Sequence, residues 1–204
     1  MEIDHCLTWK VLSKDQKKLI SLNTRCDVMS NIEPIKEKNL QETQIKEILL
    51  DCEKYNIPGE LFIRILSHVP SYAENLYDAM KRSFYSGNVS HKLKELIRIQ
   101  LSFISGDVYS QGIRSKIALE EGLSEEDIES ACSNFENDER FSEKEKWALS
   151  YSYLMYKDPK KIDSSFYEKG KQFYTEAQIM EIGSFVALHY GLQVFMRTIS
   201  LSSS

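Results

Sequence analysis

The chain has 204 residues, of which 42% are hydrophobic and 28% charged, with a formal net charge of −5. A chain of this length and apolar content can bury a sizeable core. The net negative charge argues against a general nucleic-acid-binding surface, because such surfaces need clustered Lys and Arg. Only 8 Gly and 4 Pro are present, which favours a helical fold over a turn-rich β fold.

The four cysteines, Cys6, Cys26, Cys52 and Cys132, lie far apart, without the Cys-x-x-Cys or Cys/His spacing of a metal or redox motif. We therefore expect no metal, no cofactor and no disulfide framework. No signal peptide is recognisable after Met1, so the cysteine usage predicts a reduced, cytoplasmic protein.

The first 38 residues are the least clearly patterned part of the chain. Leu7–Leu22 predicts one amphipathic helix with a Lys-rich outer side, and the polar stretch that follows is interrupted by Pro34. We interpret residues 1–38 as an N-terminal extension and residues 39–204 as one helical domain. The extension is expected to pack on the domain or on a neighbouring subunit, with a separate interaction module as the alternative.

From Leu40 on, apolar residues recur at helical spacing. The first stripe consists of Ile45, Ile48, Leu49 and Cys52. Further helices are predicted around Leu61–Leu66 and Tyr72–Phe84, the second of them ended by Gly87.

The stretch Ser90–Ile104 is apolar on most of its circumference, which predicts a buried helix. Glu95 lies inside it, and a carboxylate on a buried helix is costly unless it is paired or protonated. A break is predicted at Gly106. One further helix should then run from Asp107, which suits an N-cap, to Gly122, which suits the position after the C-cap.

The second half of the chain carries three helix starts with the capping-box pattern. They are Ser124 with Asp127, Ser142 with Glu145, and Thr175 with Gln178. The weakly charged run Ile182–Met196 contains His189 and Gln193 and is short for a membrane span, so it predicts a core helix.

The central stretch resembles the carboxymuconolactone decarboxylase/AhpD-like family. Redox members of that family carry Glu, eleven residues, Cys-x-x-Cys, three residues and then His. On this chain Glu95 matches the Glu, while Asp107 and Ser110 stand where the two cysteines belong. Tyr109 precedes the second of these positions, and Arg114 stands where the His belongs.

The resemblance extends roughly from Ile57 to Leu201, including the closing segment FYTEAQIMEIGSFVALHYGLQVFMRTIS. It implies an all-α, AhpD-like helical bundle that forms a homo-oligomer. Neither a membrane nor a nucleic acid is expected as a partner.

The replacements at the motif argue against thiol peroxidase chemistry. A helix N-terminus and a Glu–His relay lower the pKa of a thiol, because the thiolate is the attacking species. Asp107 and Ser110 cannot form a disulfide, and Cys132 would have to fold back to substitute for them.

One interpretation of the motif is structural. Asp107 would serve as an N-cap, and Ser110 would satisfy backbone groups. Arg114 lies one turn after Ser110 on the same helix face, from which it would pair with the buried Glu95.

The other interpretation is chemical, with the motif forming a polar cleft that binds a small carboxylate through a guanidinium. A carboxyl group with a raised pKa would then supply decarboxylase-type acid/base chemistry. The proposed catalytic residues are Glu95, Asp107, Ser110 and Arg114, and Tyr109 and His189 would bind the substrate. The sequence leaves both interpretations open.

Overall fold

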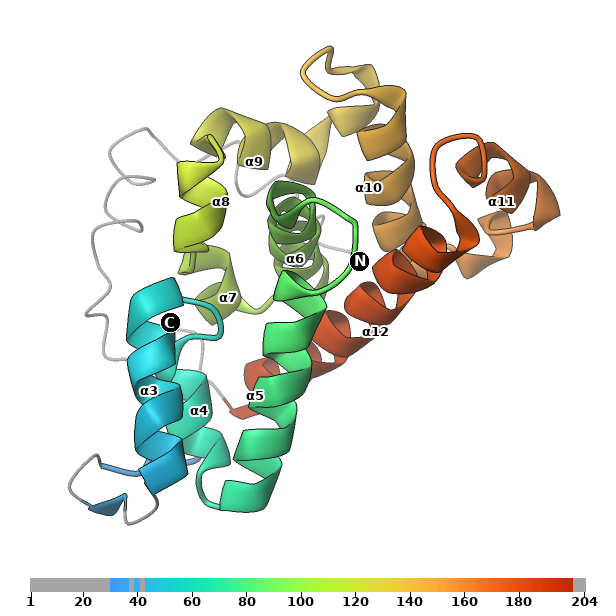
Figure 1. Cartoon of the computed structure of the whole chain (residues 1–204). Coiled ribbons are helices and arrows are strands. Elements are labelled where there is room, and N and C mark those ends of the chain that lie inside the picture. Colours follow the sequence, from blue (N-terminus) through green and yellow to red (C-terminus); the bar gives the residue numbers. More distant parts are fainter. Residues whose placement is uncertain (1–29, 37–38, 41–42, 200–204) are drawn as a thin grey trace, which may run out of the picture.

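The structure, a computed structural model, describes residues 30–36, 39–40 and 43–199 (Figure 1). Within these residues every regular element is a helix, so the predicted all-α class is confirmed. The predicted helix Leu7–Leu22 lies outside the described residues.

The helices follow one another with short connections. In chain order they are α3 (Thr43–Tyr55), α4 (Glu60–Leu66), α5 (Pro70–Tyr85), α6 (His91–Ser105), α7 (Val108–Gly112), α8 (Lys116–Glu120), α9 (Glu125–Ser133), α10 (Glu143–Lys157), α11 (Ser164–Gly170) and α12 (Glu176–Ile199). Two 3-10 turns, η2 (Phe135–Asn137) and η3 (Pro159–Lys161), flank α10.

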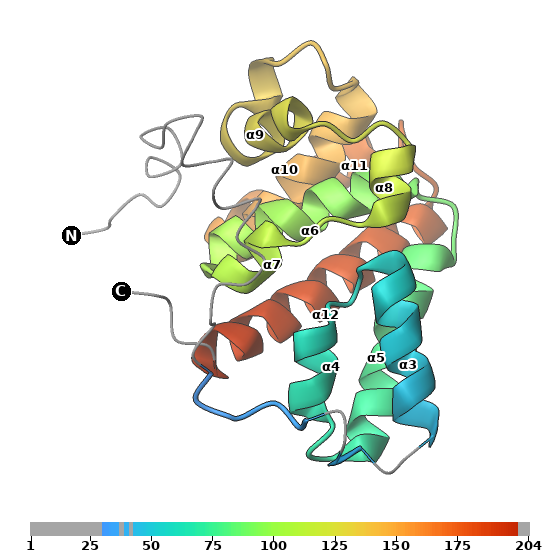
Figure 2. The ribbon, with the colours of Figure 1, turned by 90° about the vertical axis from the view of Figure 1, so that its left-hand side faces the viewer.

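Helix α6 is the centre of the fold. Every residue from Leu93 to Ser102 is buried, which explains why its sequence is apolar on nearly all sides. Helix α12 packs along one side of α6, and α9 and α10 pack along the other (Figure 2). Helices α3, α4 and α5 form a second core with the C-terminal end of α12.

Both ends of α6 are fixed by the local sequence. The Ser90 hydroxyl accepts a hydrogen bond from the backbone N–H of Leu93 at 3.3 Å, as an N-cap does. Gly106 has a φ of +72°, a left-handed conformation that costs glycine little, so the predicted break is confirmed.

The single helix predicted from Asp107 to Gly122 is wrong. The chain forms two short helices instead, α7 and α8, separated by extended backbone at Ile113 and at Ser115, the N-cap of α8. The two predicted ends are confirmed. Asp107 caps α7, and Gly122 follows α8 with a φ of +82°.

The three predicted capping boxes are confirmed. At α9 and α10 the reciprocal side-chain and backbone hydrogen bonds of Ser124 with Asp127 and of Ser142 with Glu145 are both present. At α12 the Thr175 hydroxyl accepts from the Gln178 N–H at 3.3 Å, and the Gln178 amide oxygen accepts from the Thr175 N–H at 3.1 Å.

Helix α12 is the one helix, within the described residues, that is long and apolar enough to cross a membrane by length and composition. Here its buried side, from Ile179 to Ile199, packs against α5, α6 and α10, as expected of a core helix. The short segment 30–36 lies against its C-terminal end, where the Asn31 N–H donates to the Ile199 carbonyl at 2.6 Å.

Candidate functional site

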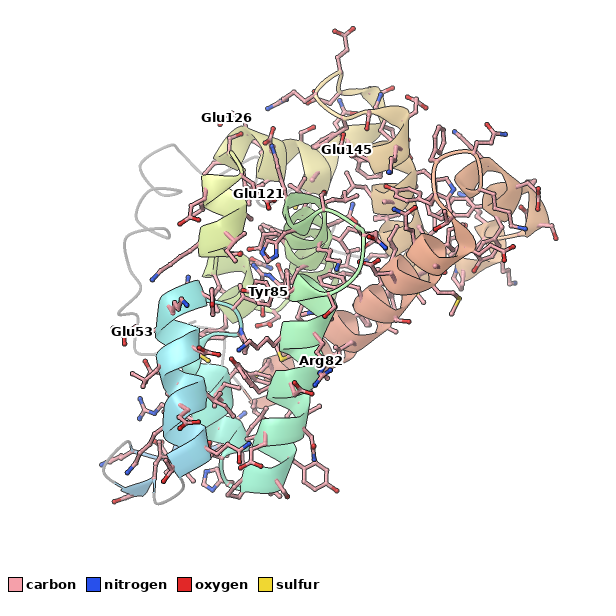
Figure 3. The ribbon with its side chains drawn as sticks, in the orientation of Figure 1. Glu53, Arg82, Tyr85, Glu121, Glu126 and Glu145 are labelled. Carbon is pink, nitrogen blue, oxygen red and sulfur yellow. The ribbon has the colours of Figure 1, made fainter. Side chains whose placement is uncertain are left out.

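The retained acid of the motif, Glu95, is fully buried in the N-terminal half of α6. Its partner is Arg98, one turn along the same helix, whose Nε and Nη2 lie 2.8 and 2.9 Å from the two carboxylate oxygens. The backbone N–H of Ser115 donates to Oε1 at 2.7 Å. Glu95 is therefore closed off by three hydrogen bonds. By contrast, Glu53 and Glu126 point outward from the surface of the molecule (Figure 3).

The same ion pair holds the break between α7 and α8. The Arg98 guanidinium donates to the Ser110 carbonyl at 2.9 Å and to the Ile113 carbonyl at 2.7 Å. Together with the Ser115 N–H on Glu95, these are backbone groups at the end of one short helix and the start of the next. Such groups lose their helical partners at a break and need others when buried. The pair supplies those partners.

The predicted pair between Glu95 and Arg114 is wrong. Arg114 binds the exposed Glu125 instead, with N–O distances of 3.0 and 3.2 Å, and donates to the carbonyls of Gln111 and Ile113. The prediction assumed one continuous helix, which would have kept residues 110 and 114 on one face. The break turns Arg114 towards the surface.

Asp107 and Ser110, which stand at the two cysteine positions, lie together at the start of α7. Oδ1 of Asp107 accepts the Ser110 N–H at 3.3 Å, which confirms the N-cap. Oδ2 is buried without a hydrogen-bond partner. Burial raises the pKa of Asp107 above its usual value, although hydrogen bonds from Ser110 and the charge of Arg98 oppose the shift.

A cavity of about 40 Å³ lies between α4, α5, α7 and α12. Three predicted site residues line it, namely Tyr109, Ser110 and His189. The other three, Glu95, Asp107 and Arg114, are not among its lining residues. The structure therefore places three of the six predicted site residues at the cavity and the other three outside its lining.

Tyr109 closes the cavity on the side of α4. A side chain at Gly59, just before α4, would collide with the Tyr109 hydroxyl and lie 2.7 Å from Ile113, so this close approach requires a glycine. Burial raises the pKa of the Tyr109 phenol, which keeps it protonated at neutral pH.

His189 lies on α12 and is buried between Phe84 and Phe185, with ring centroids 5.0 and 4.1 Å away. Its Nε2 lies 2.9 Å from the Ser83 hydroxyl, which itself donates to the Met80 carbonyl at 2.7 Å. Burial, helped by the positive charges of Arg98 and Lys94, lowers the pKa of His189 to about 3. The imidazole is therefore neutral at physiological pH.

Sequence reasoning missed two polar residues that line the cavity, Arg98 and Gln193. Arg98 was detectable, because it stands three residues after Glu95 on the same predicted helix, a spacing at which ion pairs form. Gln193 stood out only as a polar residue in an apolar run. Its Nε2 donates to the Arg98 carbonyl at 2.9 Å, while its Oε1 is buried without a partner.

Neither cysteine within the described residues lines the cavity. Cys52 is buried on α3, and burial raises the pKa of its thiol to about 12, which makes it a poor nucleophile. Cys132 lies on α9, half-buried against the main core. Cys6 and Cys26 lie outside the described residues.

Comparison with known families gives one match. The model of the carboxymuconolactone decarboxylase family matches residues 70–151, which span α5 to α10 and include the motif. No match was found among curated proteins.

Several solved structures share the fold. A variant of the debrominase Bmp8, in complex with 2,3,4-tribromopyrrole, superposes with a TM-score of 0.70 at 18% identity, covering 87% of this chain and 95% of Bmp8. The alkylhydroperoxidase AhpD core of an uncharacterized peroxidase-related protein from Ralstonia eutropha JMP134 gives 0.65 at 13% identity, covering 82% and 89%. An uncharacterized peroxidase-related protein from Silicibacter sp. TM1040 gives 0.65 at 10% identity, covering 85% and 88%.

Proposed function

We propose that this chain, whose residues 70–151 match the carboxymuconolactone decarboxylase family and whose fold resembles that of the AhpD core, is a non-redox member of that family that binds a small molecule. One observation carries the proposal. At the helix start where the redox motif needs two thiols, the chain has the N-cap Asp107 and Ser110, while Glu95 is locked in an ion pair. The cavity beside this point keeps space for a ligand.

The size and lining of the site support a ligand with few atoms. Most of the cavity wall is apolar, with Phe62, Met80 and Leu192 among the lining residues. Methionine is adaptable, so the cavity can widen around a small ring. The similarly folded Bmp8 has been solved with a brominated pyrrole, which supports a ring-sized organic ligand here.

A second candidate is decarboxylase-type acid/base chemistry, which one observation favours. Asp107 has a raised pKa and a buried Oδ2 without a partner. Ser110 lines the cavity and its N–H binds this carboxyl, so its hydroxyl would be the route for a proton held on Asp107. Asp107, not the sealed Glu95, would then be the acid.

The non-redox proposal is tested by measuring consumption of an alkyl hydroperoxide with a dithiol donor. We expect the rate with protein to equal the rate without it. The matched control replaces all four cysteines by Ser and should behave identically. Dithiol-dependent turnover that disappears in Cys132→Ser would overturn the proposal and restore thiol chemistry.

We also propose that the protein is a cytoplasmic homo-oligomer. The support is a set of exposed apolar side chains, Val194 and Phe195 on α12 and Tyr153 on α10, each 38–43% exposed. Aromatic residues concentrate at protein interfaces.

Phe195→Glu should lower the molar mass measured by light scattering after size exclusion. Met180→Glu, at the other end of α12, is the control. A monomeric wild-type protein contradicts this proposal.

A further inference from the structure

Resting on the binding function proposed above, we infer that the cavity takes an uncharged molecule with one N–H or O–H donor on a small apolar body, and that it discriminates against carboxylates. The inference rests on the hydrogen-bonding capacity of three residues that line the cavity, Gln193, His189 and Arg98.

Gln193 offers an acceptor. Its side-chain orientation is fixed, because Nε2 donates to the Arg98 carbonyl at 2.9 Å and the flipped amide would place two oxygens against each other. Oε1 is then left buried without a hydrogen-bond partner on a side chain that lines the cavity. A buried acceptor without a partner is costly, so a donor that reaches it is favoured.

His189 adds a second acceptor. The hydroxyl proton of Ser83 is used on the Met80 carbonyl, so the Ser83 oxygen is the acceptor for Nε2–H of His189. In a neutral imidazole the other ring nitrogen then carries a lone pair and no proton. His189 therefore presents acceptor character to a ligand.

Arg98 is the one cation among the lining residues, and its charge is already balanced. Glu95 binds it through two hydrogen bonds, and the carbonyls of Ser110 and Ile113 take two more of its donors. A carboxylate ligand would enter a site with two acceptors and no uncompensated positive charge. Moving an ion from water into such a site is unfavourable.

The rest of the wall sets the shape of the ligand body. Phe62, Leu192 and Met196 are apolar, and the cavity volume is about 40 Å³. A water molecule needs roughly 10–15 Å³ measured in this way. The cavity therefore holds a few atoms as it stands and a five-membered ring once Met80 or Met196 moves.

Pyrrole, furan and acetate are the probes that separate these properties. Pyrrole and furan have nearly the same shape, but only pyrrole carries an N–H donor, and acetate carries the charge. We would titrate each into the wild-type protein labelled with ¹⁵N and follow backbone amide shifts at the cavity. Pyrrole should bind about tenfold more tightly than furan, the value of one buried hydrogen bond, and acetate should cause no saturable shift.

Gln193→Met tests the acceptor and has a close control in the same protein. Gln100, on α6, has the same arrangement, with Nε2 donating to the Ala131 carbonyl at 3.0 Å and Oε1 buried without a partner. It does not line the cavity. Gln193→Met should reduce the preference for pyrrole over furan, because only the His189 acceptor remains, whereas Gln100→Met should leave the preference unchanged.

The outcomes separate this inference from the proposed function. Equal affinities for pyrrole and furan in the wild type would overturn the donor inference while leaving a binding site, and this comparison stands even if Gln193→Met does not fold. Saturable binding of acetate at the cavity would overturn the inference in favour of the decarboxylase-type alternative. If none of the probes bound, both this inference and the proposed binding function would fail.

Discussion

At the scale of single residues, the main result is which arginine neutralises Glu95. Sequence spacing placed Glu95 correctly on a buried helix but chose Arg114 as its partner, whereas the structure shows Arg98. Burial of Glu95 was predictable from its apolar neighbours. Its partner Arg98 was detectable from the i,i+3 spacing, but Arg114 was chosen because a single continuous helix was assumed after Asp107.

The two arginines provide a direct test. Arg98→Met removes one side of a buried pair and leaves Glu95 uncompensated, so the free energy of unfolding should fall by about 3–5 kcal/mol. Arg114→Met breaks a pair whose acid, Glu125, is 59% exposed, and should cost about 1 kcal/mol or less. Urea denaturation measures both. Equal losses would contradict the assignment of Arg98 as the structural partner.

His189 predicts a pH dependence. Its pKa is about 3 in the folded protein, below the ordinary value of 6.5 that applies when unfolded. Between these values the unfolded state binds more protons, so stability is lost as the pH falls from about 6.5 towards 3. The stability advantage of the wild type over His189→Asn should therefore shrink over this range in urea titrations. His68→Asn, at an exposed position, controls for the loss of one histidine.

A pH-independent difference in stability between the wild type and His189→Asn would contradict a buried neutral imidazole.

The core position of His189 was the ordinary expectation for a histidine in an apolar run. The interpretation of His189 as a substrate-binding residue together with Tyr109 did not follow from their spacing in the sequence. The role of Gln193 could not be predicted either, since only the packing of α12 on α6 shows which of its atoms lacks a partner.

At the scale of elements, the connection between α5 and α6 is held by α12. The Glu181 carboxylate accepts the backbone N–H groups of Asn88 and Val89 at 2.9 and 3.2 Å and binds the buried Lys94 at 2.6 Å. Burial opposes ionisation of Glu181, but these hydrogen bonds outweigh it and lower its pKa. Gly87 lies directly against this carboxylate.

Gly87→Ala should therefore destabilise through two effects. Its φ of +93° strains any side chain, by about 1–2 kcal/mol, and a Cβ would collide with the Glu181 carboxylate. Gly122→Ala is the matched control, because its φ of +82° gives similar strain while no atom lies within 4 Å of the added carbon. Denaturant unfolding should show a clearly larger loss for Gly87→Ala. Equal losses would show that the contact with Glu181 is unimportant.

The elements themselves differed in how far sequence could predict them. Helix starts with capping boxes, at Ser124, Ser142 and Thr175, were predictable because the pattern is local. The break between α7 and α8 was not, because the backbone groups it exposes are satisfied by Arg98 and Glu95 from another helix. Neither residue lies within the segment that breaks.

At the scale of the whole molecule, the arrangement follows from the burial of α6. A helix buried on all sides has to be covered by several others, and α9, α10 and α12 provide that cover (Figure 1). The apolar character of Ser90–Ile104 therefore predicted a buried helix. Which helix covers which side depends on long-range packing, which the sequence did not indicate.

The ion pair of Glu95 with Arg98 holds the break between α7 and α8. This role also determines which of the two residues can stand at position 95 and which at position 98. The carbonyls of Ser110 and Ile113 demand a donor, and the N–H of Ser115 demands an acceptor. Exchanging the two residues, as Glu95→Arg with Arg98→Glu, would keep the net charge. It would, however, place a donor against the Ser115 N–H and an acceptor against the two carbonyls. We expect such a reversed chain to unfold more readily than either single neutral variant, Glu95→Gln or Arg98→Met, as thermal melting would show. Electroneutrality alone is thus an insufficient rule for redesigning this interior.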